Sequence, residues 1–194
     1  FHECQVPDRT WTETVRNQGW SMIPTWVGPQ APCSGWKIRM SYDPGVAYQQ
    51  GQAEADMASL TAWQIGLAGS GMGGTIIYYD VENFNPADTA CRNVVTSFIS
   101  GWNDRLQYYG NHSGSYGGAC TSYVSDWSEA SPPPENMWVA AWSASSYIED
   151  VPLFNITCLP NNVWTNHQRI RQYAPGHNET YNGVTFNIDS NIAD

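Results

Sequence analysis

Short apolar runs alternate with long helical patterns along most of this 194-residue chain. The clearest run is Thr-Ile-Ile-Tyr-Tyr-Asp at residues 75–80. It follows a segment rich in Ala, Gln and Glu that extends from Pro44 to Gly66, and a second helical pattern extends from Thr89 to Tyr109. Buried strands that alternate with helices are typical of a parallel sheet covered by helices. The pattern therefore predicts an α/β fold.

The expected strands number six, whereas a closed parallel α/β barrel needs eight. They are expected near residues 20–27, 75–81, 113–118, 137–142, 169–173 and 184–189. The first of them is predicted to be buried and to end in the Gly28-Pro29 turn. Residues 1–194 have the length of one domain, and that domain falls two strands short of a barrel.

Composition excludes several classes of partner. The formal net charge is −10 with only eight Lys and Arg, which argues against nucleic acid and disfavours anionic membranes. No apolar run approaches the ~18 residues that a membrane span needs. Charged residues make up 13%, while ten Trp and eleven Tyr are present. Flat rings of this kind stack on sugars, although we expect most of them to fill the core.

Five cysteines and three sequons favour a secretory route. The cysteines have no metal-ligand spacing, so a zinc site is not expected. Candidate glycosylation sites are Asn111, Asn155 and Asn178, and several cysteines together with sequons are typical of an oxidising compartment. The odd cysteine count leaves one thiol free or paired outside this chain. We predict a Cys4–Cys33 disulfide, because both residues flank the same strand; the pairing of Cys91, Cys120 and Cys158 stays open.

The candidate catalytic pair is Asp80 and Glu82, at the C-terminal end of the strand at residues 75–81. Residues two apart in a strand point to the same side, with Cα atoms roughly 6–7 Å apart. Catalytic groups of parallel barrels lie at this strand end. Two close carboxylates can differ in protonation, which is what glycosidic cleavage requires. The alternative is that both residues merely cap the helix that follows.

Further candidates end other expected strands. Asp189 ends the last one, Trp142 ends the strand near residue 140, and Gln172-Tyr173 end another. If a barrel closes, all of these reach one rim. Their ordinary interpretations are a capping Asp, a core Trp and a polar strand end. The candidate substrate-binding residues are Trp26, Tyr79, Trp142, Gln172 and Tyr173.

Four stretches resemble the glycoside-hydrolase-like domain of unknown function 1906, which occurs in secreted proteins. They are residues 19–33, 77–82, 166–173 and 176–189, and they span nearly the whole chain. More distantly the chain resembles the family-25 lysozymes, through Asp80 and Glu82, through Trp138–Trp142, and through Gln172-Tyr173 followed by Ile188-Asp189.

These resemblances imply a TIM-like (β/α)8 barrel and cleavage of β-1,4 bonds in an aminosugar polymer such as peptidoglycan. Glu82 would be the general acid, and Asp80 would orient the acetamido group or stabilise positive charge. Asp189 would support the floor of the cleft. A hydrolase of this kind needs no cofactor and is expected to be extracellular.

The chain departs from both families at its beginning. Their barrels open with a Gly-Phe/Ile-Asp strand whose Asp joins the catalytic carboxylates, and nothing before Trp20 matches it. We therefore expect this chain to be the larger part of a longer protein that lacks the first two strands. A cleaved N-terminal fragment or another copy of the chain would pair with the open sheet edge. Whether the chain is an enzyme is left open, since the same fold could serve as a non-catalytic glycan-binding protein or as a self-assembling structural protein.

Overall fold

The computed structural model describes residues 6–194 and contains a single six-stranded sheet. Its elements, in chain order, are α1 (Arg9–Asn17), β1 (Thr25–Trp26), α2 (Pro44–Gln64), η1 (Ser70–Met72), β2 (Ile76–Val81), α3 (Thr89–Tyr108), β3 (His112–Gly118), η2 (Val124–Glu129), β4 (Asn136–Ala140), β5 (Arg169–Tyr181) and β6 (Val184–Ala193). The strands lie in sequence order, and β1 to β5 are parallel. The result is a mixed α/β fold with a curled half-barrel sheet.

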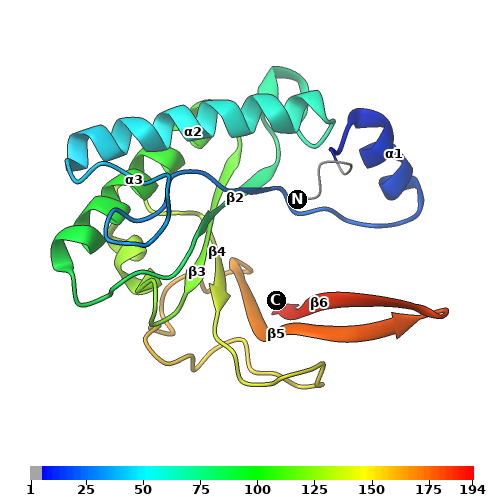
Figure 1. Cartoon of the computed structure of the whole chain (residues 1–194). Coiled ribbons are helices and arrows are strands. Elements are labelled where there is room, and N and C mark those ends of the chain that lie inside the picture. The colour runs from blue at the N-terminus through cyan, green and yellow to red at the C-terminus, as the bar shows by residue number, and fades with distance from the viewer. Residues whose placement is uncertain (1–5) are drawn as a thin grey trace.

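The last strand pair corrects the expectation of a wholly parallel sheet. β5 and β6 are antiparallel and form a long hairpin that reaches away from the other strands (Figure 1). Only Asn182 and Gly183 connect them, and both have positive φ, at 49° and 81°. A parallel connection needs a crossover of a dozen or more residues, whereas Asn-Gly favours a two-residue hairpin turn. The described residues form no closed eight-stranded barrel.

Helices α2 and α3 lie together on one face of the sheet, called here the helix-covered face (Figure 1). Each begins where an aspartate accepts a hydrogen bond from the first turn: Asp43 from Val46 N and Asp88 from Cys91 N. Pro44 at the start of α2 fits the first turn of a helix. The two expected long helices are therefore present with nearly the expected bounds.

Small residues allow α2 and α3 to approach closely. A Cβ atom built on Gly51 would lie 2.1 Å from Phe98 O, and one on Gly101 would lie 2.0 Å from Tyr48 O. Both distances are far shorter than real carbon contacts. Glycine at these two positions is therefore what sets the spacing of the helix pair.

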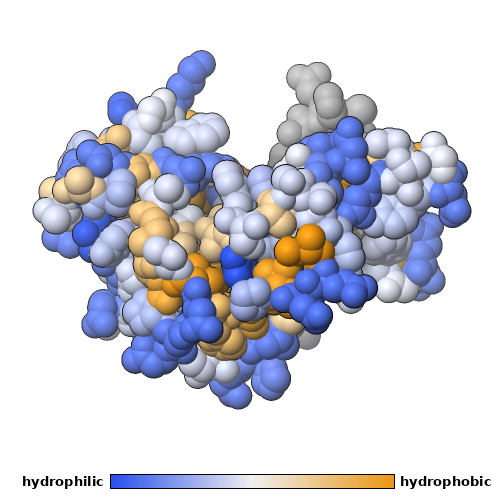
Figure 2. All heavy atoms as spheres, turned by 90° about the horizontal axis from the view of Figure 1, so that it is seen from below, coloured by the Kyte–Doolittle hydropathy of each residue, from blue (hydrophilic) through white to orange (hydrophobic). Residues whose placement is uncertain are grey.

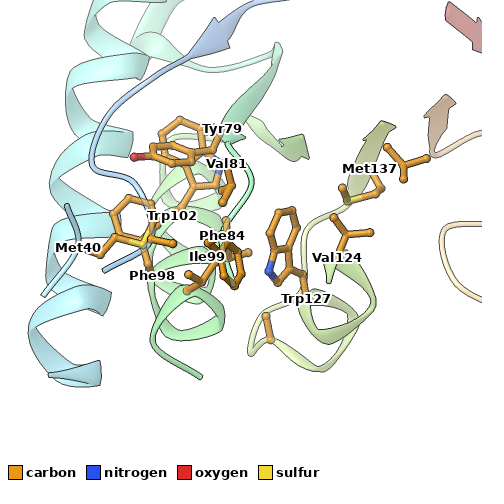
Figure 3. Packing of buried hydrophobic residues seen from close by; sticks show 14 of the residues in the cluster. Met40, Tyr79, Val81, Phe84, Phe98, Ile99, Trp102, Val124, Trp127 and Met137 are labelled. Atoms are coloured by element: carbon orange, nitrogen blue, oxygen red, sulfur yellow. The ribbon is translucent and has the colours of Figure 1, made fainter. Parts of the chain in front are cut away.

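The main core lies between these helices and the sheet (Figure 3). Tyr79 is fully buried there, with its ring 4.7 Å from that of Phe98 and 5.0 Å from that of Trp102. Its hydroxyl donates to Pro29 O at 2.7 Å. Burial of large side chains such as these contributes about 2–3 kcal/mol each. This packing fixes β2, and so places the residues at its C-terminal end.

The first strand is much shorter than expected and is not buried along its length. Of residues 20–27, only Thr25 and Trp26 pair with β2, and Trp20, Ile23 and Val27 are 67%, 49% and 57% exposed. β1 forms an edge of the sheet, and Pro24 has no N–H to donate to a ladder. Because β1 is the edge strand of the sheet, the apolar residues around Pro24 are not buried on both faces of the strand.

Two disulfides stabilise the loops, and one of them corrects the predicted pairing. Cys33 bonds to Cys91, so the predicted Cys4–Cys33 bond is wrong; Cys4 itself lies outside the described residues. The loop after β1 brings Cys33 beside Cys91, which lies in the first turn of α3. The prediction considered only which strand the cysteines flank, and this does not show where the loop travels. Cys120 bonds to Cys158 and ties the end of β3 to the loop between β4 and β5.

One of the three sequons is unsuited to carry a glycan. Asn111 is 3% exposed, and its amide donates to Ser59 Oγ and Met72 O while its oxygen accepts from Thr75 N. A glycan on this nitrogen would displace those partners. Asn155 and Asn178 are exposed and stay candidates.

Candidate active site

Alternation along the strands divides the sheet into two chemically different faces. Ile77, Tyr79 and Val81 point to the helix-covered face, so Asp80 points to the opposite, open face. Asp80 pairs in register with Tyr116 on β3, and Tyr116 pairs with Trp138 on β4. Figure 2 shows the side of the molecule away from α2, where hydrophobic residues gather near the middle and hydrophilic ones surround them.

A buried glutamine holds the carboxylate pair in place. Gln30, which is 2% exposed, donates from Nε2 to Asp80 O at 2.8 Å and accepts at Oε1 from Glu82 N at 2.8 Å. One side-chain amide thus binds the backbone on both sides of Val81. Glu82 follows directly after β2, and the bond to Gln30 fixes its backbone N–H.

Asp80 lies in an environment that disfavours its charge. Burial, and secondly the like charge of Glu82, raise the pKa of Asp80 to about 6. Its Oδ1 atom is buried and has no hydrogen-bond partner in the described chain. A buried carboxylate oxygen without a hydrogen-bond partner lowers the stability of the folded protein. Carboxyl groups with a pKa perturbed in this way are typical of functional clefts.

A hydrogen-bonded network joins the ends of β3 and β4 to residues within β5 and β6. Gln172 Oε1 accepts from Tyr116 Oη and from Trp142 Nε1, each at 3.0 Å, and Gln172 Nε2 donates to Asp189 Oδ2 at 3.0 Å. Burial, followed by the charges of Asp80, Glu82 and Asp189, raises the pKa of Tyr116 to about 12. The three predicted carboxylates therefore surround one tyrosine.

The pocket at these strand ends has a volume of about 530 Å³. Glu82 and Asn83 line it just after β2, Tyr116 lines it near the end of β3, and Trp142 lines it just after β4. The loops from Gly118 to Thr121 and from Asn155 to Thr157 form other walls. The cleft thus lies at the C-terminal ends of parallel strands, where α/β folds place their ligands.

Three of the candidate substrate-binding residues lie elsewhere. Trp26 faces the helix-covered side, where its Nε1 donates to Glu54 Oε2 at 2.7 Å, and Tyr79 is sealed in the core. Tyr173 is 2% exposed, packs with Val151, and donates to Ile148 O. Tyr79 and Tyr173 are buried by packing, and Trp26 is half-buried on the helix-covered face, so none of the three lines the cleft. Trp142 and Gln172 do belong to the cleft.

Sequence reasoning missed Gln30, Tyr116 and Arg171. Tyr116 carried a usable signal, because it lies in an expected strand that neighbours the strand of Asp80. Gln30 carried none, because it reaches β2 from a loop; Arg171 lies in an expected strand, but its place in the pocket wall depends on contacts with Ala141 and Pro152. Among residues 6–194, no group of three or more His, Cys, Asp or Glu side chains could hold a metal ion.

A model of the Rv2525c-like, glycoside hydrolase-like domain matches residues 4–193. The chain belongs to this family. A glycan-related role at the family level follows, and the resemblance to the glycoside-hydrolase-like domain of unknown function 1906 is confirmed. A search of curated proteins found no match.

A similar fold appears in a solved structure, the 1.07 Å crystal structure of an uncharacterized B. stearothermophilus protein. It aligns with a TM-score of 0.60 at 17% identity, over 98% of this chain and 81% of the other. At that identity the likeness concerns the fold alone. Within the described residues, no helix of this glycoside hydrolase-like domain is long and apolar enough to cross a bilayer.

Asp80→Asn is expected to stabilise the protein at pH 7, by on the order of 2 kcal/mol, and to have little effect near pH 3.5. The folded-state pKa of about 6 lies above the unfolded value near 3.9. Below both values the carboxyl is neutral in both states. As the pH rises from about 4 to 6 the unfolded state ionises first, so wild type loses stability that the asparagine variant keeps. Urea unfolding at several pH values measures this, and an equal difference at pH 3.5 and pH 7 would contradict it.

Proposed function

We propose that the cleft binds and cleaves β-1,4-linked aminosugar polymers such as peptidoglycan. The observation that carries the proposal is Glu82, which lines a pocket together with Tyr116 and Trp142 while a second carboxylate lies two residues earlier. Aromatic rings suit the apolar faces of sugars, and paired carboxylates suit glycosidic cleavage. Membership in a glycoside hydrolase-like family supports the same class of ligand.

The proposed mechanism gives the two carboxylates different roles. Glu82, which reaches the pocket, protonates the glycosidic oxygen as the bond from that oxygen to the anomeric carbon breaks. Asp80 lies behind it and does not line the pocket, so it acts as an electrostatic or orienting group. Above pH 6 Asp80 is charged and stabilises positive charge at the anomeric carbon. Water then bonds to the anomeric carbon and gives a proton to the Glu82 carboxylate, which restores the acid.

Gln172, Trp142 and Asp189 form the proposed sugar platform. Trp142 is 60% exposed, which leaves most of its ring free to stack, while its indole nitrogen is held by Gln172. Asp189 holds Gln172 in turn and so supports the floor of the cleft. The proposal needs no cofactor. Two disulfides are typical of proteins that fold in an oxidising compartment, which supports a secreted, extracellular location.

A second candidate is a non-catalytic glycan-binding or self-assembling protein on the same fold. Its support is the edge strand β1, which supplies only Thr25 and Trp26 beside β2 and therefore no third carboxylate. An edge of this kind also has unpaired backbone groups that another polypeptide could bind. Such a polypeptide would be an N-terminal fragment or a second copy of the chain.

Digestion of peptidoglycan and of chitin oligomers tests the two candidates. Products are followed by mass spectrometry with wild type and with Glu82→Gln, and binding of uncleaved oligomers is measured by calorimetry. Release of fragments by wild type alone supports the hydrolase. Binding without cleavage by either protein supports the second candidate, and sedimentation then shows whether the chain self-associates.

A further inference from the structure

Arg171 is a buried cation in the wall of the cleft. It lies on β5, is 7% exposed, and lines the same pocket as Glu82. It is the one basic side chain among the described residues that line this pocket. Arginine is almost never buried to this extent without an acidic partner.

No carboxylate neutralises this guanidinium within residues 6–194. Its Nε donates to Ala141 O at 3.0 Å and its Nη1 to Pro152 O at 2.6 Å, both of them neutral backbone oxygens. Burial lowers the pKa of Arg171, and no acidic group opposes that effect. Nη2 donates no hydrogen bond to any side chain or backbone group that the structure describes.

Comparison with Arg169 shows that a buried arginine on β5 need not line the pocket. It lies two residues earlier on the same side of β5, is 1% exposed, and also donates to backbone carbonyls, those of Pro160 and Val163. It does not line the pocket, and its guanidinium packs over the ring of Phe154 at 4.5 Å. Arg169 therefore has a structural role, whereas the same residue type at 171 faces a space large enough for a ligand.

Arg171 and Glu82 lie at opposite ends of the cleft. Arg171 lies on β5 and Glu82 follows β2, and the strands β3 and β4 lie between them in the sheet. Three strand spacings correspond to roughly 14 Å along the sheet. A ligand that reaches from one to the other meets a general acid at one end and an uncompensated positive charge at the other.

We propose that Arg171 forms an anion subsite that selects glycans with a carboxylate, such as muramic acid or a uronic acid. The guanidinium is a planar fork of donors that matches a carboxylate, and such charge-assisted hydrogen bonds are among the stronger ones. Backbone carbonyls at Ala141 and Pro152 hold it in position before a ligand arrives. The inference rests on the glycan cleft proposed above, and it adds that the glycan bound there carries a negative charge.

Paired sugars that differ by a carboxylate test the subsite. Binding is followed by NMR at pH 7, with N-acetylmuramic acid against N-acetylglucosamine and with glucuronate against glucose. The acidic member of at least one pair is expected to bind about tenfold more tightly or better. Which pair shows the difference identifies the source of the carboxylate. The preference should weaken as sodium chloride is raised.

Variants separate recognition from folding. Arg171→Gln should abolish the preference for the acidic sugar while binding of the neutral sugar is retained. Arg171→Lys keeps the charge without the fork, so it should retain part of the preference even if the glutamine variant folds poorly. Arg169→Gln is the matched control and should leave the preference unchanged. A preference that survives in Arg171→Gln, or that is lost equally in Arg169→Gln, overturns the proposal.

The outcomes also distinguish this inference from the proposed function. If neutral aminosugars bind or are cleaved and the acidic sugars bind no better, the subsite is wrong and the glycan cleft stands. If no sugar of either pair binds and no polymer is cleaved, both proposals fail. If free lactate binds as tightly as N-acetylmuramic acid, the site takes small anions rather than acidic glycans, and the proposal is wrong in that form.

Discussion

Replacing Glu82 with glutamine is expected to lower the rate of glycan cleavage about 10²- to 10⁴-fold, which is the usual contribution of a general acid. The amide has nearly the same shape, so oligomer binding should stay within a few-fold of wild type. Glu82 N would still donate to Gln30, since that bond involves the backbone. Loss of turnover with retained binding is therefore the signature of a proton donor rather than of a structural residue.

The measurement is kcat/KM on a chitin or peptidoglycan oligomer across pH. The wild-type rate should rise as the pH passes upward through about 6, where Asp80 becomes charged. Glu129→Gln, an exposed glutamate on η2 outside the cleft, is the control and should behave as wild type. Equal rates for wild type and Glu82→Gln would remove the catalytic role. Glu82→Gln should also lower the pKa of Asp80, but not fully, because burial is the larger cause of its shift.

Gly101→Ala is expected to lower the free energy of unfolding by about 2 kcal/mol or more. Alanine is the better helix former by about 1 kcal/mol, so an exposed site would gain stability. Here the new methyl carbon would lie 2.0 Å from Tyr48 O, a backbone atom that cannot rotate away. The helices α2 and α3 must therefore separate, which weakens the packing of Phe98 and Trp102.

Thermal unfolding measures this as a loss of roughly 4–8 °C. Gly35→Ala is the control, because no atom lies within 4 Å of its Cβ position, and it should change stability little. Gly51→Ala should resemble Gly101→Ala, since it meets Phe98 O at 2.1 Å. The double variant should cost less than the sum of the two, because the first substitution has already moved the helices apart. Full additivity would contradict this explanation.

The position of Asp80 and Glu82 could be predicted because it depends on local sequence. An apolar run between two helical patterns identifies β2, and its end follows directly. The same alternation rule could have excluded Tyr79, since it is adjacent in sequence to Asp80, which points to the open face. The hairpin of β5 and β6 was also readable, because Asn182-Gly183 is a strong turn signal.

Other parts of the site could not be predicted, because they depend on where loops travel. Gln30 reaches β2 from 50 residues away, and Arg171 donates to Ala141 O and Pro152 O in the connection between β4 and β5. The pairing of Cys33 with Cys91, which are 58 positions apart, depends on the same loop path. Sequence spacing contains no information on such contacts unless the loop conformation is known.

The Gln30 contact has a consequence for how this cleft could change over evolution. In a parallel ladder, a strand residue donates to one neighbour and accepts from the residue two positions along. The Gln30 side chain makes the same two bonds, to Asp80 O and from Glu82 N. One amide thus substitutes for a residue of the adjacent strand after the backbone of that strand has left the sheet. The loop that carries Gln30 is free to lengthen or to acquire new specificity, provided that this amide stays, without moving the carboxylates it serves.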